Sequence, residues 1–134
     1  MAEAIGLAAS ISSILQIVGQ ITKLSYSYVY DIKNAPKTQK QYLQEISAFT
    51  DVLFRAEQAI QEAEATGLLP ARPTSLDDNV LKECQRTLST LHLDLEKRLR
   101  RLLWPFQEKE LKKYIDALHK FRAIFADFLS ANIL

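Results

Sequence analysis

Apolar residues recur at steps of three and four along four separate segments of this chain. That spacing places them on one face of an α-helix, and no segment shows the alternate-residue pattern of a strand. The four predicted helices cover, to within a few residues, about 3–33, 37–66, 76–103 and 107–132. Each helix can bury its apolar face only against the others. The sequence therefore predicts an all-α fold, an antiparallel bundle of four long helices forming a single domain over residues 1–134.

Proline and glycine residues fall between these segments. Pro36 is expected at the start of the second helix and Pro105 at the end of the third, because proline pushes the preceding residue out of helical geometry. Residues 67–74, GLLPARPT, predict one proline-rich loop among otherwise short connections. Gly67 is the expected stop of the second helix, and Ser75 is the expected N-cap of the third.

Composition and charge exclude several classes of function. The net charge is only +1, and although residues 67–134 hold twelve basic against nine acidic residues, this balance is far from that of a nucleic-acid-binding protein. The single cysteine, Cys84, can form no internal disulfide, and no basic residue precedes the apolar N-terminal run as in a signal sequence. We therefore expect a cytoplasmic protein with no nucleic-acid partner.

The chain holds few groups suited to catalysis. His92 and His119 are its two histidines. Asp116 and His119 share a helix face, but a di-metal bundle needs a second such pair and further inward carboxylates, so His119 is expected at the surface. Cys84 lies on an apolar stripe, where a buried and inert thiol is expected. The sequence therefore predicts a protein that is not an enzyme and has no metal or cofactor.

A basic cluster ends the third predicted helix and leaves two interpretations open. It consists of Lys97, Arg98, Arg100 and Arg101. Positive side chains stabilise the C-terminal end of a helix, and they also attract anionic phospholipid headgroups. Trp104 beside them suits either a membrane interface or a core position at a helix junction.

The first segment carries no charge over the 19 residues from Ala4 to Thr22. At about 1.5 Å per residue this run nearly spans the hydrocarbon layer of a bilayer. Its serines and glutamines are too many for a single span facing lipid on all sides, and a bundle helix with a wide apolar arc explains the same pattern. Its outer face, however, lacks the charges that a surface helix normally carries.

Three stretches of the sequence resemble one known family. They are the opening MAEAIGLAASISSILQIVGQITKLSYSYV, the junction at residues 34–37, NAPK, and above all residues 102–110, LLWPFQEKE. Together they resemble the N-terminal domain of fungal NLR-like (STAND) and ankyrin-repeat proteins, which is related to the HeLo-like cell-death domains. The resemblance covers essentially the whole chain. It implies a helical-bundle effector domain that precedes nucleotide-binding and repeat domains in a longer protein.

The resemblance also implies a mechanism and residues for it. In related domains, oligomerisation drives the N-terminal helix into the plasma membrane and causes cell death. Trp104 and Pro105 would then be structural. The membrane-active residues would be Ile5, Leu7, Ile11, Ile14, Leu15 and Val18.

Two functions thus remain as expectations from the sequence. The first is a non-enzymatic cell-death effector of the fungal innate-immunity or heterokaryon-incompatibility type, which self-associates and permeabilises an anionic phospholipid membrane through its first helix. The second is a soluble interaction or oligomerisation module of an NLR-like receptor that never enters lipid.

Overall fold

The protein is a bundle of four α-helices in the computed structural model, as the apolar spacing predicts. The helices are α1 (Ala2–Tyr28), α2 (Lys37–Thr66), α3 (Asp78–Arg98) and α4 (Glu108–Asn132). The structure describes the backbone of residues 2–28, 35–67, 76–98 and 106–132, with side chains for 6–27, 35–67, 76–97 and 106–131. Residues 29–33 and 99–103, predicted as helical, lie outside these ranges.

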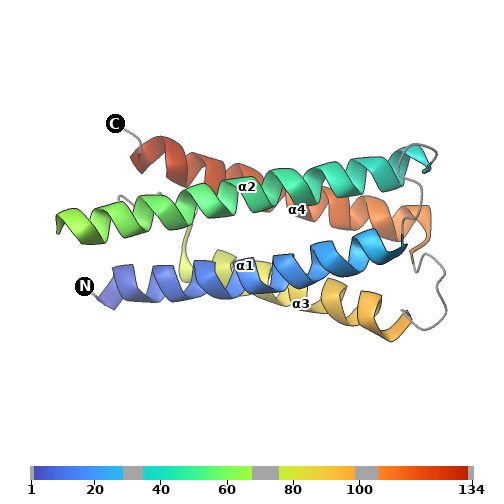
Figure 1. Ribbon diagram of the computed structural model, residues 1–134, viewed down its shortest axis with the longest axis horizontal. Helices are drawn as coiled ribbons and strands as arrows, with labels where there is room; N and C mark the ends of the chain where they lie inside the picture. The colour runs from blue at the N-terminus through green and yellow to red at the C-terminus, as the bar shows by residue number, and fades with distance from the viewer. Residues whose placement is uncertain (1, 29–34, 68–75, 99–105, 133–134) are drawn as a thin grey trace.

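Successive helices run in opposite directions along the bundle (Figure 1). Consecutive helices are not always neighbours, however. α1 packs beside α2 and α3, and α4 packs closely on α2 and loosely on α3. α2 and α3 therefore occupy opposite corners of the bundle. Two of the neighbouring pairs, α1 with α3 and α2 with α4, run parallel to each other (Figure 1).

The apolar stripes of all four helices meet in one core. On α2 the predicted stripe is buried from Ile46 to Ile60, and the rings of Phe49 and Phe125 lie 5.9 Å apart where α2 meets α4. The predicted stripe of α4 is buried at Leu111, Leu118, Phe121, Phe125 and Phe128, and Tyr114 is half-buried. The three-and-four spacing thus predicted the core-facing side of each helix correctly.

Local hydrogen bonds define the helix ends. Gly67 ends α2 with a positive φ of 74°, as expected, and its N–H donates to the Glu64 carbonyl oxygen at 3.2 Å. The predicted N-cap of α3 was wrong, because the Val80 N–H donates to Asp77 Oδ1 at 2.9 Å and makes Asp77 the capping residue. Ser75 lies outside the described residues.

Replacement of the cap residue tests this assignment. We expect Asp77→Ala to lower the free energy of unfolding by about 1 kcal/mol, because the Val80 N–H loses its acceptor. Asp77→Asn keeps a side-chain oxygen in place and should cost clearly less. Urea denaturation followed by circular dichroism measures both variants. Equal losses for the two would show that the charge of Asp77, rather than the cap hydrogen bond, stabilises the start of α3.

Candidate functional site

The inner side of α1 belongs to the core. Leu7, Ile11, Ile14 and Val18 are each at most 2% exposed, and Leu15 is half-buried against them. The Ile5 side chain lies outside the described residues. In this state, the described residues among those predicted to contact lipid therefore pack in the core of the bundle.

The outer side of α1 is exposed and uncharged for most of its length. Its exposed residues between Gly6 and Gln20 are Gly6, Ala9, Ser12, Gln16, Gly19 and Gln20. Lys23 is the first charged residue after them. The segment Gly6–Ser27, 22 residues long, is long and apolar enough to cross a membrane, although the core helix of a soluble bundle meets the same criterion. The unusual feature of α1 is thus its uncharged outer surface.

Polar side chains fasten α2 to α4. The Arg122 guanidinium donates two hydrogen bonds of 3.0 Å to the Glu45 carboxylate, and His119 Nδ1 lies 3.2 Å from the same carboxylate. Nearer the end of the bundle, the Thr38 hydroxyl donates to Glu108 Oε1 at 3.0 Å. Such paired and directional contacts specify the register of one helix against the other.

Polar contacts also join α3 to α4, whose backbones approach each other less closely than those of the other neighbouring helices. The Tyr114 hydroxyl donates to Asp94 Oδ2 at 3.1 Å, and Lys120 Nζ lies 3.3 Å from Glu83 Oε1. Burial, the hydrogen bond to Asp94 and the negative charges of Asp94 and Glu110 together raise the pKa of Tyr114 to about 12. The phenol therefore stays protonated and keeps donating at any physiological pH.

By contrast, α1 has one polar link to the rest of the bundle among the described side chains. The hydroxyls of Ser25 and Tyr42 lie 2.8 Å apart in a buried position. The other side-chain hydrogen bonds of α1, from Thr22 and Ser27, go to carbonyl oxygens of α1 itself. No ion pair joins a described α1 side chain to another described helix. From Gly6 to Leu24, the described side chains therefore hold α1 to the other described helices by apolar packing alone.

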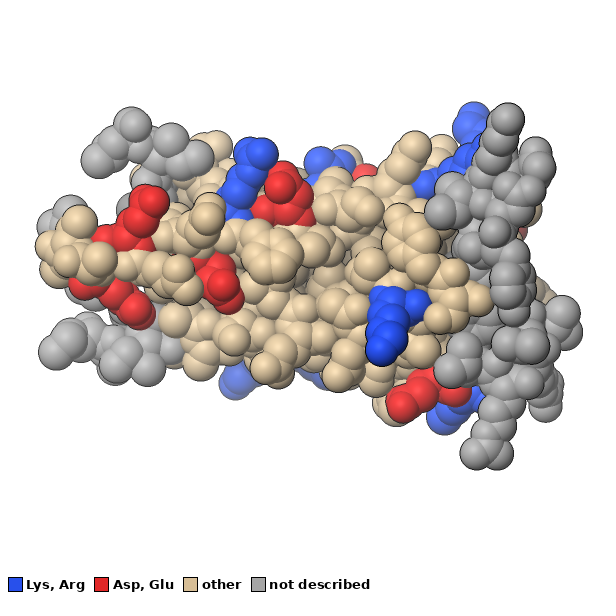
Figure 2. Space-filling view, viewed as in Figure 1, with Lys and Arg blue, Asp and Glu red and all other residues tan. Residues whose placement is uncertain are grey.

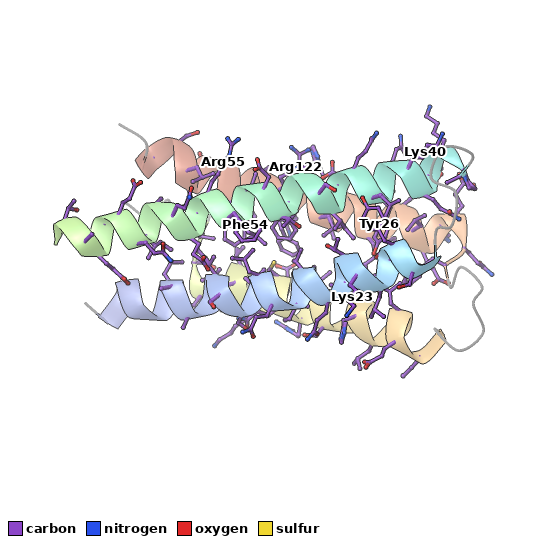
Figure 3. All side chains as sticks on the ribbon, in the orientation of Figure 1. Lys23, Tyr26, Lys40, Phe54, Arg55 and Arg122 are labelled. Carbon is purple, nitrogen blue, oxygen red and sulfur yellow. The ribbon has the colours of Figure 1, made fainter. Side chains whose placement is uncertain are left out.

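The outer surfaces of α1 and α2 form one face of the molecule, which we call the α1–α2 face. A band of uncharged residues runs along this face, with Lys23 toward one end and acidic side chains mainly toward the other (Figure 2). The exposed ion pair of Arg55 with Asp51 borders this band near Phe54. Phe54 projects from the middle of this face and is 55% exposed, and Tyr26 is 41% exposed near the lysine end (Figure 3). Phe54 was not among the predicted site residues, although the periodicity of α2 places it off the apolar stripe.

The remaining predicted site residues are dispersed or undescribed. Lys97 is exposed in the last turn of α3, and Arg98 ends that helix without a described side chain. Arg100, Arg101, Trp104 and Pro105 lie outside the described residues. Pro36 is exposed directly before α2, and the Lys40 N–H donates to its carbonyl oxygen at 3.1 Å.

The described residues offer no obvious catalytic chemistry. Cys84 is fully buried, and burial raises the pKa of its thiol to about 12, so the thiol stays protonated. Among these residues no three acidic, histidine or cysteine side chains are grouped to hold a metal. An open groove of about 600 Å³ between α2 and α4 includes Glu45 and Arg122 in its lining, and these two neutralise each other.

The Glu45–Arg122 pair should give the bundle a measurable pH dependence. Burial by itself would raise the pKa of the Glu45 carboxyl, but the hydrogen bonds from Arg122 and His119 and their charges bring it below the ordinary 4.5. The carboxylate therefore stabilises the fold above that pH, and its contribution is lost as the pH falls from about 5 through the lowered pKa.

Glu45→Gln removes this contribution. We expect the variant to lose about 1–3 kcal/mol of unfolding free energy at pH 7, with a smaller difference from the parent protein below pH 4. Glu83→Gln, in the exposed pair with Lys120, should change the stability by less than about 1 kcal/mol. Denaturant titrations at a series of pH values measure both. A pH-independent difference for Glu45→Gln would contradict the assignment.

Comparisons of the chain with protein-family models, curated proteins and solved structures find no match.

Proposed function

We propose that this domain is a non-enzymatic effector that stores a membrane-active helix, α1, inside a water-soluble bundle and releases it to an anionic phospholipid membrane. The observation that carries this proposal is the difference between α1 and the other helices. α2, α3 and α4 are joined by ion pairs and hydrogen bonds, whereas the described side chains of α1, residues 6–27, attach it by apolar packing and one hydroxyl pair.

Apolar side chains can leave the protein core for the lipid tails of a bilayer at little cost in free energy. Lipid tails are as apolar as leucine, so Leu7, Ile11, Ile14, Leu15 and Val18 would find an equivalent environment in a bilayer. Charged side chains would oppose that transfer at about 2.5–3.5 kcal/mol each near the middle of a span. α1 has none between Ala4 and Thr22, on its inner or its outer side.

Release would expose the core surfaces that α1 covers on α2 and α3. Self-association of several copies would cover these surfaces again, which agrees with the homo-oligomer that the family resemblance implies. The basic residues Lys97, Arg98, Arg100 and Arg101 would supply attraction to anionic headgroups, about 1 kcal/mol for each residue near the surface. The protein would then be cytoplasmic at rest and move to the plasma membrane when activated.

The alternative function is a soluble interaction module in the same kind of receptor. The observation that favours it is the exposed ring of Phe54 on the α1–α2 face, since large exposed aromatic side chains are enriched at protein interfaces. In that case α1 would remain in the bundle throughout.

Two matched glutamine replacements separate these functions. Gln16 lies near the middle of α1 and Gln58 lies on α2, and both are exposed, so a lysine at either position should change the stability by about 0.5 kcal/mol or less. If α1 inserts, residue 16 enters the bilayer, whereas residue 58 on α2 stays outside it. We expect Gln16→Lys to reduce dye release from anionic vesicles about a hundredfold, with Gln58→Lys close to the parent protein.

The vesicle measurement needs the 134-residue chain both free and fused to an inducible oligomer, because clustering is part of the proposal. Circular dichroism confirms the fold of each variant. Release that is equal for Gln16→Lys and the parent protein would overturn insertion of α1. Absence of release from both free and clustered protein would do the same and would favour the soluble module.

A further inference from the structure

Positive charge is concentrated toward one end of the bundle. α1 and α3 end there, and α2 and α4 begin there (Figure 1). The sequence ranges 23–41 and 93–113, which contain these four helix ends, hold eleven basic against five acidic residues, whereas the rest of the chain holds six against eleven. The small net charge of +1 therefore conceals a strong separation of charge along the chain.

Five lysines near these helix ends are exposed. They come from all four helices and together form what we call the basic end: Lys23, Lys37, Lys97, Lys109 and Lys113. Among the described residues, no ion pair includes any of these five lysines. Their positive charges are therefore available to a partner outside the chain.

Most described carboxylates at the same helix ends already have partners within the chain. Asp94 and Glu108 accept hydrogen bonds from hydroxyl groups of α4 and α2, at 3.1 and 3.0 Å. Glu96 lies 3.9 Å from His92 Nδ1. These internal contacts leave the lysines as the larger share of the charge that this end offers to a partner.

We propose that the basic end docks on an anionic phospholipid surface, so that the folded bundle stands end-on with the C-terminal end of α1 next to the headgroups. The inference rests on the proposed function for its choice of a membrane as the partner, but docking does not require α1 to leave the bundle. Lysine suits such a surface, because its ammonium group is a mobile point charge on a flexible stem and the headgroup charge is spread over an area.

Two features of α1 favour lipid over an acidic protein as the partner. Tyr26, three residues after Lys23, is 41% exposed near the basic end, and tyrosine is enriched at the headgroup level of membranes (Figure 3). The uncharged run of α1 reaches Thr22, directly before Lys23. End-on docking therefore places the helix that is long and apolar enough to cross a membrane with its C-terminal end at the bilayer surface.

The distance between the two charged ends favours the end-on orientation. The exposed Glu62 and Glu64 lie about 40 Å along α2 from Lys37, at about 1.5 Å per residue. The Debye length at physiological ionic strength is about 8 Å, so an anionic surface at the basic end attracts the lysines and hardly acts on these glutamates. A bundle lying flat would bring both ends to the surface, and repulsion of the glutamates would offset the attraction.

Two matched pairs of substitutions test the location of the contact. Lys109→Gln with Lys113→Gln removes two positive charges from the basic end. Lys82→Gln with Arg86→Gln removes two from α3, where Arg86 lies about 16 Å from Lys97. In both pairs the residues are exposed and four positions apart on one helix, and glutamine keeps the helix propensity. We expect the first pair to weaken binding to phosphatidylserine-containing vesicles about thirtyfold and the second to leave it nearly unchanged.

Vesicle flotation measures this binding whether or not the vesicles leak, and circular dichroism verifies the fold. Vesicles of phosphatidylcholine alone should not bind the parent chain. Equal weakening by the two pairs, or no binding to anionic vesicles, would overturn docking by the basic end. If the chain then bound polyglutamate instead, the partner would be an acidic protein. Docking as expected without any dye release would contradict the proposed function alone, and release without docking would contradict this inference alone.

Fluorescent labels at the two ends of α4 test the orientation. Gln107, directly before α4, and Ser130, near its end, are both exposed, and Gln107→Cys or Ser130→Cys supplies a site for the label. Cys84 is fully buried, so the label goes to the introduced cysteine. With nitroxide-headgroup lipids in the vesicles, we expect strong quenching at position 107 and little at position 130, about 35 Å farther along the helix. Equal quenching, or stronger quenching at position 130, would overturn the end-on orientation.

Discussion

The apolar contact of α1 with both α2 and α3 is the interaction on which the rest of this bundle depends. α2 and α3 stand at opposite corners, and α3 touches α4 only sparsely, so α1 is the principal packing partner of α3. α2 and α4 form the other closely packed pair of helices. α1, whose described side chains make one polar link to the other helices, thus also connects α3 to the rest of the bundle.

Polar and apolar contacts have separate roles in this structure. Between α2 and α4, Glu45 binds both Arg122 and His119, and these directional contacts specify how the two helices align. Between α1 and its neighbours the contact is almost wholly apolar, which gives strong attraction but few directional constraints. In such a bundle, directional polar contacts specify how α2 packs against α4. The apolar side of α1 could pack equally well against another apolar surface.

Much of the fold is readable from local patterns. The spacing of Ile46, Phe49 and Leu53 predicted the buried side of α2, and the position of Gly67 predicted its end. The start of α3 was less readable, because Ser75, Asp77 and Asp78 are all residues that cap helices well, and the choice depends on which backbone N–H lies within reach. The pairing of Glu45 with Arg122 was not readable, since residues 77 positions apart carry no local signal of proximity.

The sequence by itself determined that the chain forms four amphipathic helices and that the first of them is uncharged from Ala4 to Thr22, because both follow from residue type and helical period. Only the tertiary structure decided which helices became neighbours. α2 and α3 are consecutive yet diagonal, and the polar link of α1 that the described side chains show is the hydroxyl pair of Ser25 with Tyr42. The physical reason is that apolar stripes specify burial without specifying a partner, whereas the partner is selected by the joint packing of four helices and by the few polar groups that meet between them.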